Sequence, residues 1–542
     1  MKEKKTVKSR MLQGLLSGAA GILLVKLISL FYIVPLNAFM GPAVSAGYAA
    51  ARNIGLVLAE VCCAGIPYAV ITMTAVRKEK EDWRTILLIR KISLSLLIAL
   101  GFVVANILIL NARPLAVLIL SSEAAAEDID MLQKMLSFIS IIIFTSPWII
   151  DLFCFFHGLS NDHTAVNAVW INWIARFGIL VVFGLGAAYG MHASNTFIGY
   201  IGILSFGAGC CAALYYLVTA DRRNYQRMHE LACEQEMPAE NINTLNRELL
   251  SFSTVFVLSA VFGNAGSIMD SLFFISALEK GGAAYDTARN LYSLLEWNGN
   301  IFVYALQTAA VMILNLFLDN ISHDYAKKDM DAFCLTVEAW LNTAMYYLLP
   351  AAFTLGVLIQ PIFYILFGSL DASGSTMLIW TVGAGMISAA ALCAWILLIR
   401  LKQYSEAATY AVIGGIVKAA AFFPCLNWMG ASGAPASSVL ASAVIVFLSF
   451  SKISNLSDIS YAKVFINFLR ITAACLAMNG AYVLLRTFVF DLTDASRWMA
   501  FGQILLMCAC GTSVYIFIMN LMGLRKKVRS YRKNISSKEE SL

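Results

Sequence analysis

The sequence predicts an all-α membrane protein that crosses the bilayer about fourteen times. Of its 542 residues, 60% are hydrophobic and only 13% are charged. Apolar runs of about 20 residues, the length that a helix needs to span a bilayer, recur along nearly the whole chain. The runs are continuous rather than alternating, which favours helices over a closed barrel. The predicted fold class is therefore a polytopic all-α protein with two pseudo-symmetric six-helix lobes and two C-terminal helices.

The hydrophobic segments are separated by polar connections whose charges predict the topology. We expect spans near residues 12–38, 48–76, 86–110, 132–157, 166–188, 194–219, 248–277, 287–316, 334–360, 374–399, 405–427, 433–451, 463–486 and 498–522. Lysines and arginines then gather in the N-terminal head, in the C-terminal tail and in every even-numbered connection except the fourth. Basic connections mark the cytoplasmic side, so both termini are predicted to be cytoplasmic.

The longest polar connection, Asp221 to Glu248, divides the chain. We expect an N-terminal lobe over 1–220, a cytoplasmic linker over 221–247 and a C-terminal lobe over 248–452. Two further spans and a basic tail fill 453–542. A six-plus-six arrangement is typical of transporters built from an internal repeat. The linker has mixed charges and helix-forming residues, so an amphipathic helix and a plain solvated connection are both compatible with it.

The sequence lacks the motifs that are typical of several other classes of function. The twelve cysteines and five histidines show no disulfide or metal spacing, so we expect no cofactor and no metal site. No nucleotide-binding G-x-x-x-x-G-K-[ST] loop occurs, so we expect no ATPase domain in the chain. The net charge of +6 reports topology and predicts no nucleic-acid partner. Coupling to a proton or a sodium ion stays open, with Glu60, Asp151 and Asp270 as candidates.

Ionisable residues inside the predicted spans are the candidate functional residues. A charge at mid-bilayer costs about 2.5–3.5 kcal/mol on the insertion scale, and it usually faces a bundle interior, where it pairs or lines a path. The ionisable residues within or near the ends of the spans are Lys26, Arg52, Glu60, Asp151, Arg176, Asp270, Arg289, Glu296, Glu338, Lys418 and Arg470.

Three of these residues, Lys26, Arg52 and Arg176, predict a cationic substrate-binding cavity between the two halves. Such a cavity would hold a pyrophosphate group through charge-assisted hydrogen bonds, for which the planar arginine fork is well suited. The alternative is interhelical ion pairing, such as Lys26 with Glu60, or snorkelling toward the interface. Ion coupling or ion pairing is the expected role of the remaining candidates, Glu60, Asp151, Asp270, Glu296, Lys418 and Arg470.

The second predicted span is interrupted by Gly65 and Pro67. Proline removes a backbone hydrogen bond of the helix and opposes the preceding turn. The two residues predict a kink, which either serves as a hinge or is a static bend.

The same region carries a family resemblance. Leu36 to Tyr48, with Gly41 and Gly47, and the following Ala64-Gly65-Ile66-Pro67-Tyr68-Ala69-Val70 are similar to the opening of certain bacterial flippases. These are the stage V sporulation protein B-like and MurJ-like members of the multidrug/oligosaccharidyl-lipid/polysaccharide (MOP) exporter superfamily. Phe155-Phe156-His157-Gly158 and Arg176 also resemble positions of that family, whereas Asn172 stands where the family often has a glutamate.

The resemblance implies a multi-pass transporter of the bacterial cytoplasmic membrane and not an enzyme. Its implied substrate and partner is a polyprenyl-(pyro)phosphate-linked saccharide, a cell-wall or polysaccharide precursor, moved across the bilayer by alternating access. The last two spans would supply a groove for the lipid tail, in contact with membrane lipids. The alternatives are a cation-coupled multidrug exporter of the same superfamily, a membrane glycosyltransferase or polymerase, and an envelope-assembly scaffold.

Overall fold

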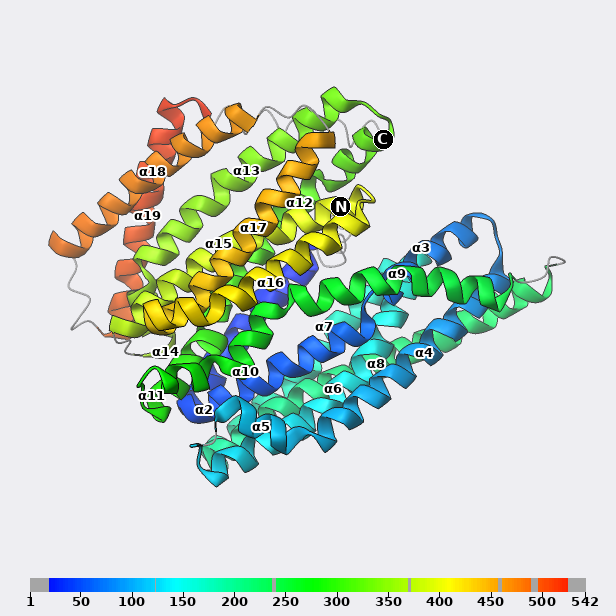
Figure 1. Ribbon diagram of the computed structural model, residues 1–542, viewed down its shortest axis with the longest axis horizontal. Helices are drawn as coiled ribbons and strands as arrows, with labels where there is room; N and C mark the ends of the chain where they lie inside the picture. Colours follow the sequence, from blue (N-terminus) through cyan, green and yellow to red (C-terminus); the bar gives the residue numbers. More distant parts are fainter. Residues whose placement is uncertain are drawn as a thin grey trace, which may run out of the picture. The chain divides into compact units, whose positions relative to one another are not determined.

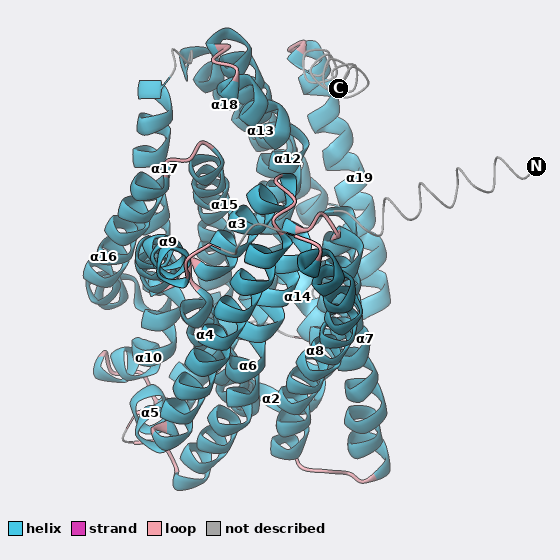
Figure 2. Ribbon diagram, turned by 90° about the vertical axis from the view of Figure 1, so that its right-hand side faces the viewer, coloured by secondary structure: helices cyan, strands magenta, loops and turns pink. Residues whose placement is uncertain are grey.

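The computed structural model describes residues 19–121, 123–235, 240–368, 372–456, 461–488 and 496–524. Helices account for nearly all of these residues, and no β-strand occurs among them (Figure 2). The predicted all-α class is confirmed. The chain divides into two compact units, Met1–Trp297 and Asn298–Leu542. The predicted division into lobes at the linker 221–247 remains a prediction.

The described residues contain eleven helices long and apolar enough to cross a membrane, or twelve if one bent pair counts as a single span. That pair is Met330–Val357 with Ile359–Phe367, bent by 72°. One stretch, Tyr404–Leu456, contains two of the predicted spans. The first predicted span, 12–38, lies largely where side chains are not described. The prediction of about fourteen spans is therefore close to the observed number.

The first unit is built from long helices joined by short connections. Its elements are α2 (Ala19–Cys63), α3 (Ile66–Glu79), α4 (Trp83–Leu110), α5 (Ala112–Leu120), α6 (Ala126–Gly158), α7 (Asp162–Ile179), η1 (Leu180–Gly190), α8 (Asn195–Cys233), α9 (Ile242–Gly263), α10 (Ala265–Lys280), α11 (Tyr285–Ser293) and η2 (Leu294–Gly299). Helix α6 packs against α2, α4 and α8, and Figure 1 shows α4, α6 and α8 side by side. Residues on α6 are therefore surrounded by several helices.

The predicted break near Gly65 and Pro67 is observed between α2 and α3. Gly65 has φ 84° and ψ −36°, a left-handed conformation that glycine adopts without steric cost. Pro67 lies in the first turn of α3, where the missing N–H breaks no helical hydrogen bond. The two residues end one helix and begin the next, and their use as a hinge remains a prediction.

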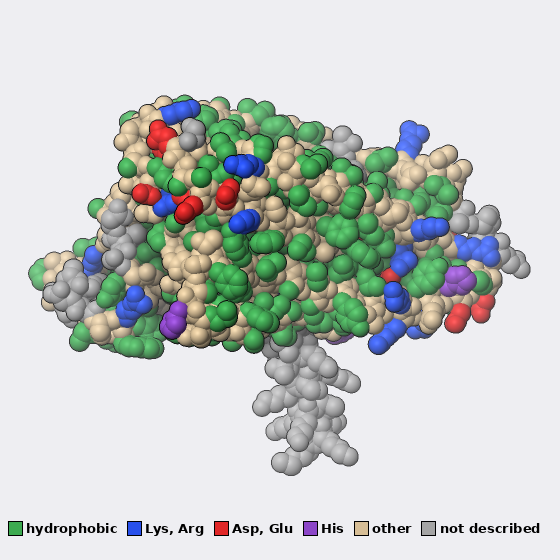
Figure 3. All heavy atoms as spheres, turned by 90° about the horizontal axis from the view of Figure 1, so that it is seen from below, with side chains coloured by type: hydrophobic (Ala, Val, Ile, Leu, Met, Phe, Trp, Pro, Cys, Tyr) green, Lys and Arg blue, Asp and Glu red, His purple; other side chains and the backbone are tan. Residues whose placement is uncertain are grey.

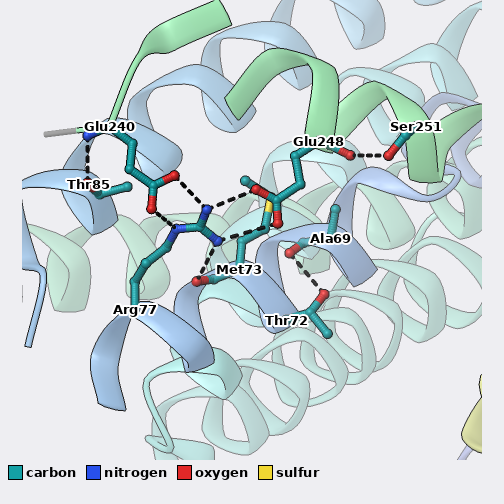
Figure 4. Close-up of polar contacts among 8 residues, drawn as sticks. All are labelled: Ala69, Thr72, Met73, Arg77, Thr85, Glu240, Glu248 and Ser251. Atoms are coloured by element: carbon teal, nitrogen blue, oxygen red, sulfur yellow. Dashed lines mark hydrogen bonds and ion pairs between the residues drawn. The ribbon is translucent and has the colours of Figure 1, made fainter. Parts of the chain in front are cut away.

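The predicted linker is partly helical, because α8 continues to Cys233 and α9 begins at Ile242. Arg77 of α3 holds the end of this linker through two carboxylates (Figure 4). Its Nη2 lies 2.8 Å from Glu240 Oε2 and 2.9 Å from Glu248 Oε2. The N–H of Glu240 also donates to Thr85 Oγ1 at 3.0 Å. We call Arg77, Glu240 and Glu248 the Arg77 clamp.

The second unit contains the remaining helices. They are α12 (Asn300–Ala326), α13 (Met330–Val357), α14 (Ile359–Phe367), α15 (Ala372–Arg400), α16 (Tyr404–Met429), η3 (Gly430–Ser432), α17 (Gly433–Leu456), α18 (Tyr461–Phe488) and α19 (Arg497–Leu521). Helices α16 and α17 pack together along the hairpin that turns at Gly430, and α15 packs against α12 and α17. The last two helices, α18 and α19, pack on each other, and α18 also packs on α13.

Large hydrophobic side chains are exposed on both units. Trp428 is 86% exposed, Trp498 85% and Leu110 80%. Hydrophobic side chains cover much of the face drawn in Figure 3. Exposed apolar surface of this extent, together with eleven or twelve long apolar helices, is expected of helices that contact lipid. The chain is a multi-pass membrane protein.

Candidate functional site

Arg52 and Glu296 meet in the interior of the first unit. Arg52 is buried on α2, where its Nη2 donates to Asn53 Oδ1 at 3.1 Å and to the backbone oxygen of Glu296 at 3.4 Å. Asn53 Nδ2 donates to the Glu296 carboxylate at 2.5 Å. Glu296 lies in η2, a π-helical turn, and such turns occur often at functional sites. The structure thus brings together two candidates that are 244 residues apart in the chain.

A pair of buried aromatic rings joins Arg52 to Arg176. Tyr48 and Trp297 pack edge to face with centroids 4.8 Å apart. The Arg52 guanidinium lies 5.4 Å from the Trp297 ring centroid. Arg176, also buried, donates from Nη2 to the Tyr48 hydroxyl at 3.3 Å, and its guanidinium lies 3.9 Å from the Phe206 ring centroid. Tyr48, Arg52, Asn53, Arg176, Glu296 and Trp297 together form what we call the arginine cluster.

The arginine cluster has acidic neighbours. Tyr292 is fully buried and donates to Ser271 Oγ at 3.1 Å. It lies within electrostatic range of Glu296, Asp270 and Arg52. The buried Asp270 of α10 therefore belongs to the surroundings of the cluster. Two guanidinium groups and two carboxyl groups thus lie in or beside the arginine cluster.

Two further candidates, Lys26 and Glu60, also belong to α2 but are not members of the arginine cluster as described. The side chain of Lys26 lies outside the described residues, so its convergence with Arg52 and its pairing with Glu60 both stay predictions. Glu60 is exposed, and its carboxylate accepts a hydrogen bond from Asn264 Nδ2 at 3.1 Å.

Asp151 occupies a separate buried position on α6. It is completely buried, and Ser93 Oγ lies 3.2 Å from its Oδ2. Arg90 of α4, near Ser93, pairs with Asp221 of α8 through two contacts.

The second-unit candidates differ in their surroundings. Lys418 is buried, and its ammonium group donates to the Ala434 carbonyl oxygen at 2.9 Å, to Ser437 Oγ at 3.0 Å and to Ser438 Oγ at 2.8 Å. These contacts use three donors, the full number that an ammonium has, within the α16–α17 hairpin. Arg470 is exposed on α18. The structure does not bring these two residues together, and their predicted coupling roles stay predictions.

Reasoning from the sequence missed the residues that connect the candidates. Tyr48 lies one helical turn before Arg52, so the two share a face of α2, and this spacing was a usable signal. Asn53 is a polar residue beside Arg52 in an apolar run, and Trp297 follows Glu296 directly. The contacts between α2 and η2 have no signal in a single sequence, because they join segments far apart in the chain.

The chain is similar to known proteins over nearly its whole length. No protein-family model matches the chain. The lipid II flippase MurJ of Bacillus subtilis (strain 168) is 20% identical over 545 residues, which cover 97% of this chain and 98% of that protein. A solved lipid II flippase MurJ in an inward closed conformation has a TM-score of 0.62 and 15% identity, covering 92% of this chain and 97% of that one.

A multidrug resistance transporter of the MATE family, solved in an inward-facing conformation, has a TM-score of 0.55 and 12% identity. The match covers 81% of this chain and 99% of that one. The chain therefore has the fold that a solved MurJ flippase shares with a MATE transporter of the MOP superfamily, and the resemblance predicted from the sequence is confirmed.

Proposed function

We propose that this protein is a flippase that moves a polyprenyl-(pyro)phosphate-linked saccharide across the cytoplasmic membrane by alternating access. The end-to-end similarity to a protein described as a lipid II flippase supports this class of substrate. So does the burial of two arginines in one cluster, since arginine binds phosphate oxygens through paired, charge-assisted hydrogen bonds. The saccharide would be a cell-wall or polysaccharide precursor, and both termini would lie in the cytoplasm.

One observation carries the proposal. Arg52 Nε is buried and has no hydrogen-bond acceptor among the described residues. The contact from its Nη2 to the Glu296 backbone oxygen is 3.4 Å, longer than the usual hydrogen bond. A buried, unused donor of a charged group is costly. A phosphate oxygen would supply the missing acceptor, and Arg176 on the other side of the aromatic pair would add a second cation.

Direct binding tests this proposal. A polyprenyl-pyrophosphate saccharide is titrated into the purified protein in nanodiscs, and Kd is compared with those of Lys26→Ala, Arg52→Ala and Arg176→Ala. A hydrogen bond to a charged group contributes about 1.5–3 kcal/mol, so Kd rises roughly tenfold or more for Arg52→Ala and Arg176→Ala. Arg223→Ala, which removes an exposed arginine of α8 outside the candidate residues, is the matched control and keeps the original Kd.

A cation-coupled multidrug exporter of the same superfamily is the second candidate. The carboxyl groups of Asp270 and Glu296 near the arginine cluster favour it, because they would attract a cationic drug or a coupling ion. Equal saccharide binding by all variants, or binding by none, would overturn the flippase. Efflux of a cationic dye, lost in Asp270→Asn and Glu296→Gln, would then support the exporter. No observation favours a glycosyltransferase or a scaffold.

A further inference from the structure

Asp151 is a buried carboxyl group that pairs with no lysine or arginine in the described part of the chain. It has 0% exposure on α6, and its Oδ1 has no hydrogen-bond partner among the described residues. Its Oδ2 lies 3.2 Å from Ser93 Oγ. No ion pair of Asp151 occurs in the part of the chain that the structure describes. An isolated carboxylate in such a place is so costly that the group takes up a proton instead.

The charges around Asp151 are engaged elsewhere. Arg90 of α4 turns its guanidinium to Asp221 of α8, with Nε 2.7 Å from Asp221 Oδ1 and a second contact between Nη2 and Oδ2. The thiols of Cys63 at the end of α2 and of Cys154 on α6 also lie within electrostatic range of Asp151. Arg90 and Asp221 thus act on Asp151 as an already neutralised pair.

Counting hydrogens at Ser93 leads to the same protonation state. Ser93 Oγ lies 3.2 Å from Asp151 Oδ2 and 3.3 Å from the Arg90 carbonyl oxygen, two acceptors if Asp151 is ionised. A hydroxyl has one hydrogen and can donate to one of them only. If Asp151 carries a proton on Oδ2, it donates to Ser93 Oγ, and Ser93 donates to Arg90. Both contacts of Ser93 Oγ are then hydrogen bonds.

We propose that Asp151 is a proton-binding site, with its carboxyl group protonated in this conformation and hydrogen-bonded to Ser93. A metal cation would need several oxygen ligands, and no group of three His, Cys, Asp or Glu residues in the described chain could hold one. A single carboxyl group with one hydroxyl partner favours a proton over a metal cation as the ligand of this site.

The position of Asp151 suits a coupling role, a part of the inference that rests on the proposed transport function. Its helix ends at Gly158, where an added Cβ would lie 3.0 Å from the Ile71 backbone oxygen and 3.0 Å from Thr74 Cβ of α3. Cys63, the last residue of α2, lies within its electrostatic range. Release of the proton would leave a bare carboxylate beside the α2–α3 break, and this conformation would lose stability relative to one that hydrates or pairs Asp151.

Two measurements on the purified full-length protein in nanodiscs test proton binding without any substrate. Dicyclohexylcarbodiimide, a hydrophobic reagent for protonated carboxyl groups, is applied over a range of pH, and labelled residues are found by mass spectrometry. Asp151 is labelled at neutral pH, and labelling falls about tenfold per pH unit above its apparent pKa. Infrared difference spectra show the carbonyl stretch of a protonated acid, which is lost in Asp151→Asn.

Controls separate the site from general reactivity and from misfolding. Glu406, whose carboxylate lies 2.7 Å from Lys452 Nζ, stays unlabelled. Ser93→Ala keeps the acid and removes its partner, so the carbonyl band shifts instead of disappearing. An unlabelled Asp151, together with no acid band in the wild type and no change in Ser93→Ala, would overturn the inference. Labelling without saccharide binding would keep the proton site and refute the proposed substrate.

Discussion

At the scale of single residues, buried polar groups of the first unit form hydrogen bonds with polar neighbours in the same cluster. Asn53 is a link between the two charges of the arginine cluster, because it accepts from Arg52 at 3.1 Å and donates to Glu296 at 2.5 Å. Buried polar groups are expensive to leave unpaired, so a neutral amide in this position stabilises both.

Asn53→Ala is predicted to destabilise the protein. The substitution leaves the buried Glu296 carboxylate without this donor, at a cost of about 1–3 kcal/mol. Thermal unfolding of the detergent-solubilised protein should show a lower midpoint. Asn106→Ala on α4, an exposed asparagine bonded to the Phe102 backbone oxygen, is the control and should change stability by less than about 0.5 kcal/mol. Equal losses for both would contradict the linking role.

At the scale of elements, breaks and clamps set how the helices of the first unit are joined. The α2–α3 break depends on the left-handed backbone of Gly65, and the end of the linker depends on the Arg77 clamp. Arg77 was expected only as one of the basic residues that mark the cytoplasmic side. The structure gives it a second task, since its guanidinium lies between two carboxylates (Figure 4).

Gly65→Ala should lower stability, because a side chain at φ 84° costs about 1–2 kcal/mol. Gly178→Ala in α7 is the matched control. Apart from its chain neighbours and the backbone of its own helix, no described atom lies within 4 Å of its added Cβ, and alanine is favoured over glycine in a helix interior by about 1 kcal/mol. The two variants should therefore shift the unfolding midpoint in opposite directions, and a shift of the same sign in both would count against the assigned strain.

Arg77→Gln should release the linker near Glu240. Both carboxylates of the clamp are partly exposed, so each pair contributes little alone and is weakened by salt. Limited proteolysis of the purified protein should cut near Glu240 several-fold faster in the variant, and high salt should narrow the difference. Lys80→Gln, which removes an exposed basic residue close by, is the control and should leave the cleavage rate unchanged.

At the scale of the whole molecule, the long apolar helices and the placement of basic residues govern how the chain sits in the bilayer. The positive-inside pattern of the sequence predicts the orientation of the chain in the bilayer.

The predicted orientation places the C-terminus in the cytoplasm. A green fluorescent protein fused after Leu542 should therefore fluoresce, because this reporter folds in the cytoplasm. It does not become fluorescent when it is exported across the membrane in an unfolded state. The same fusion after Leu110, beside a connection predicted to lie outside, should be dark. The reverse pattern would invert the topology and with it the direction of transport that we propose.

The sequence by itself determined the fold class, the approximate number of spans and the family resemblance, and it pointed to several of the charges that are buried. These properties follow from local composition, because a bilayer requires about 20 apolar residues per helix and penalises every charge within them. The break at Gly65 and Pro67 was equally readable, since backbone geometry is a property of the residue itself.

Only the tertiary structure decided which charges meet. It joined Arg52 to Glu296 directly and to Arg176 through the rings of Tyr48 and Trp297. It left Glu60 exposed. It also gave the Lys418 ammonium group three hydrogen-bond acceptors within the α16–α17 hairpin. It also left Asp151 without an ion pair among the described residues, because Arg90 pairs with Asp221 instead. Pairing of this kind depends on contacts between distant segments and on a few ångströms of helix rotation, and a list of residues along one chain contains neither.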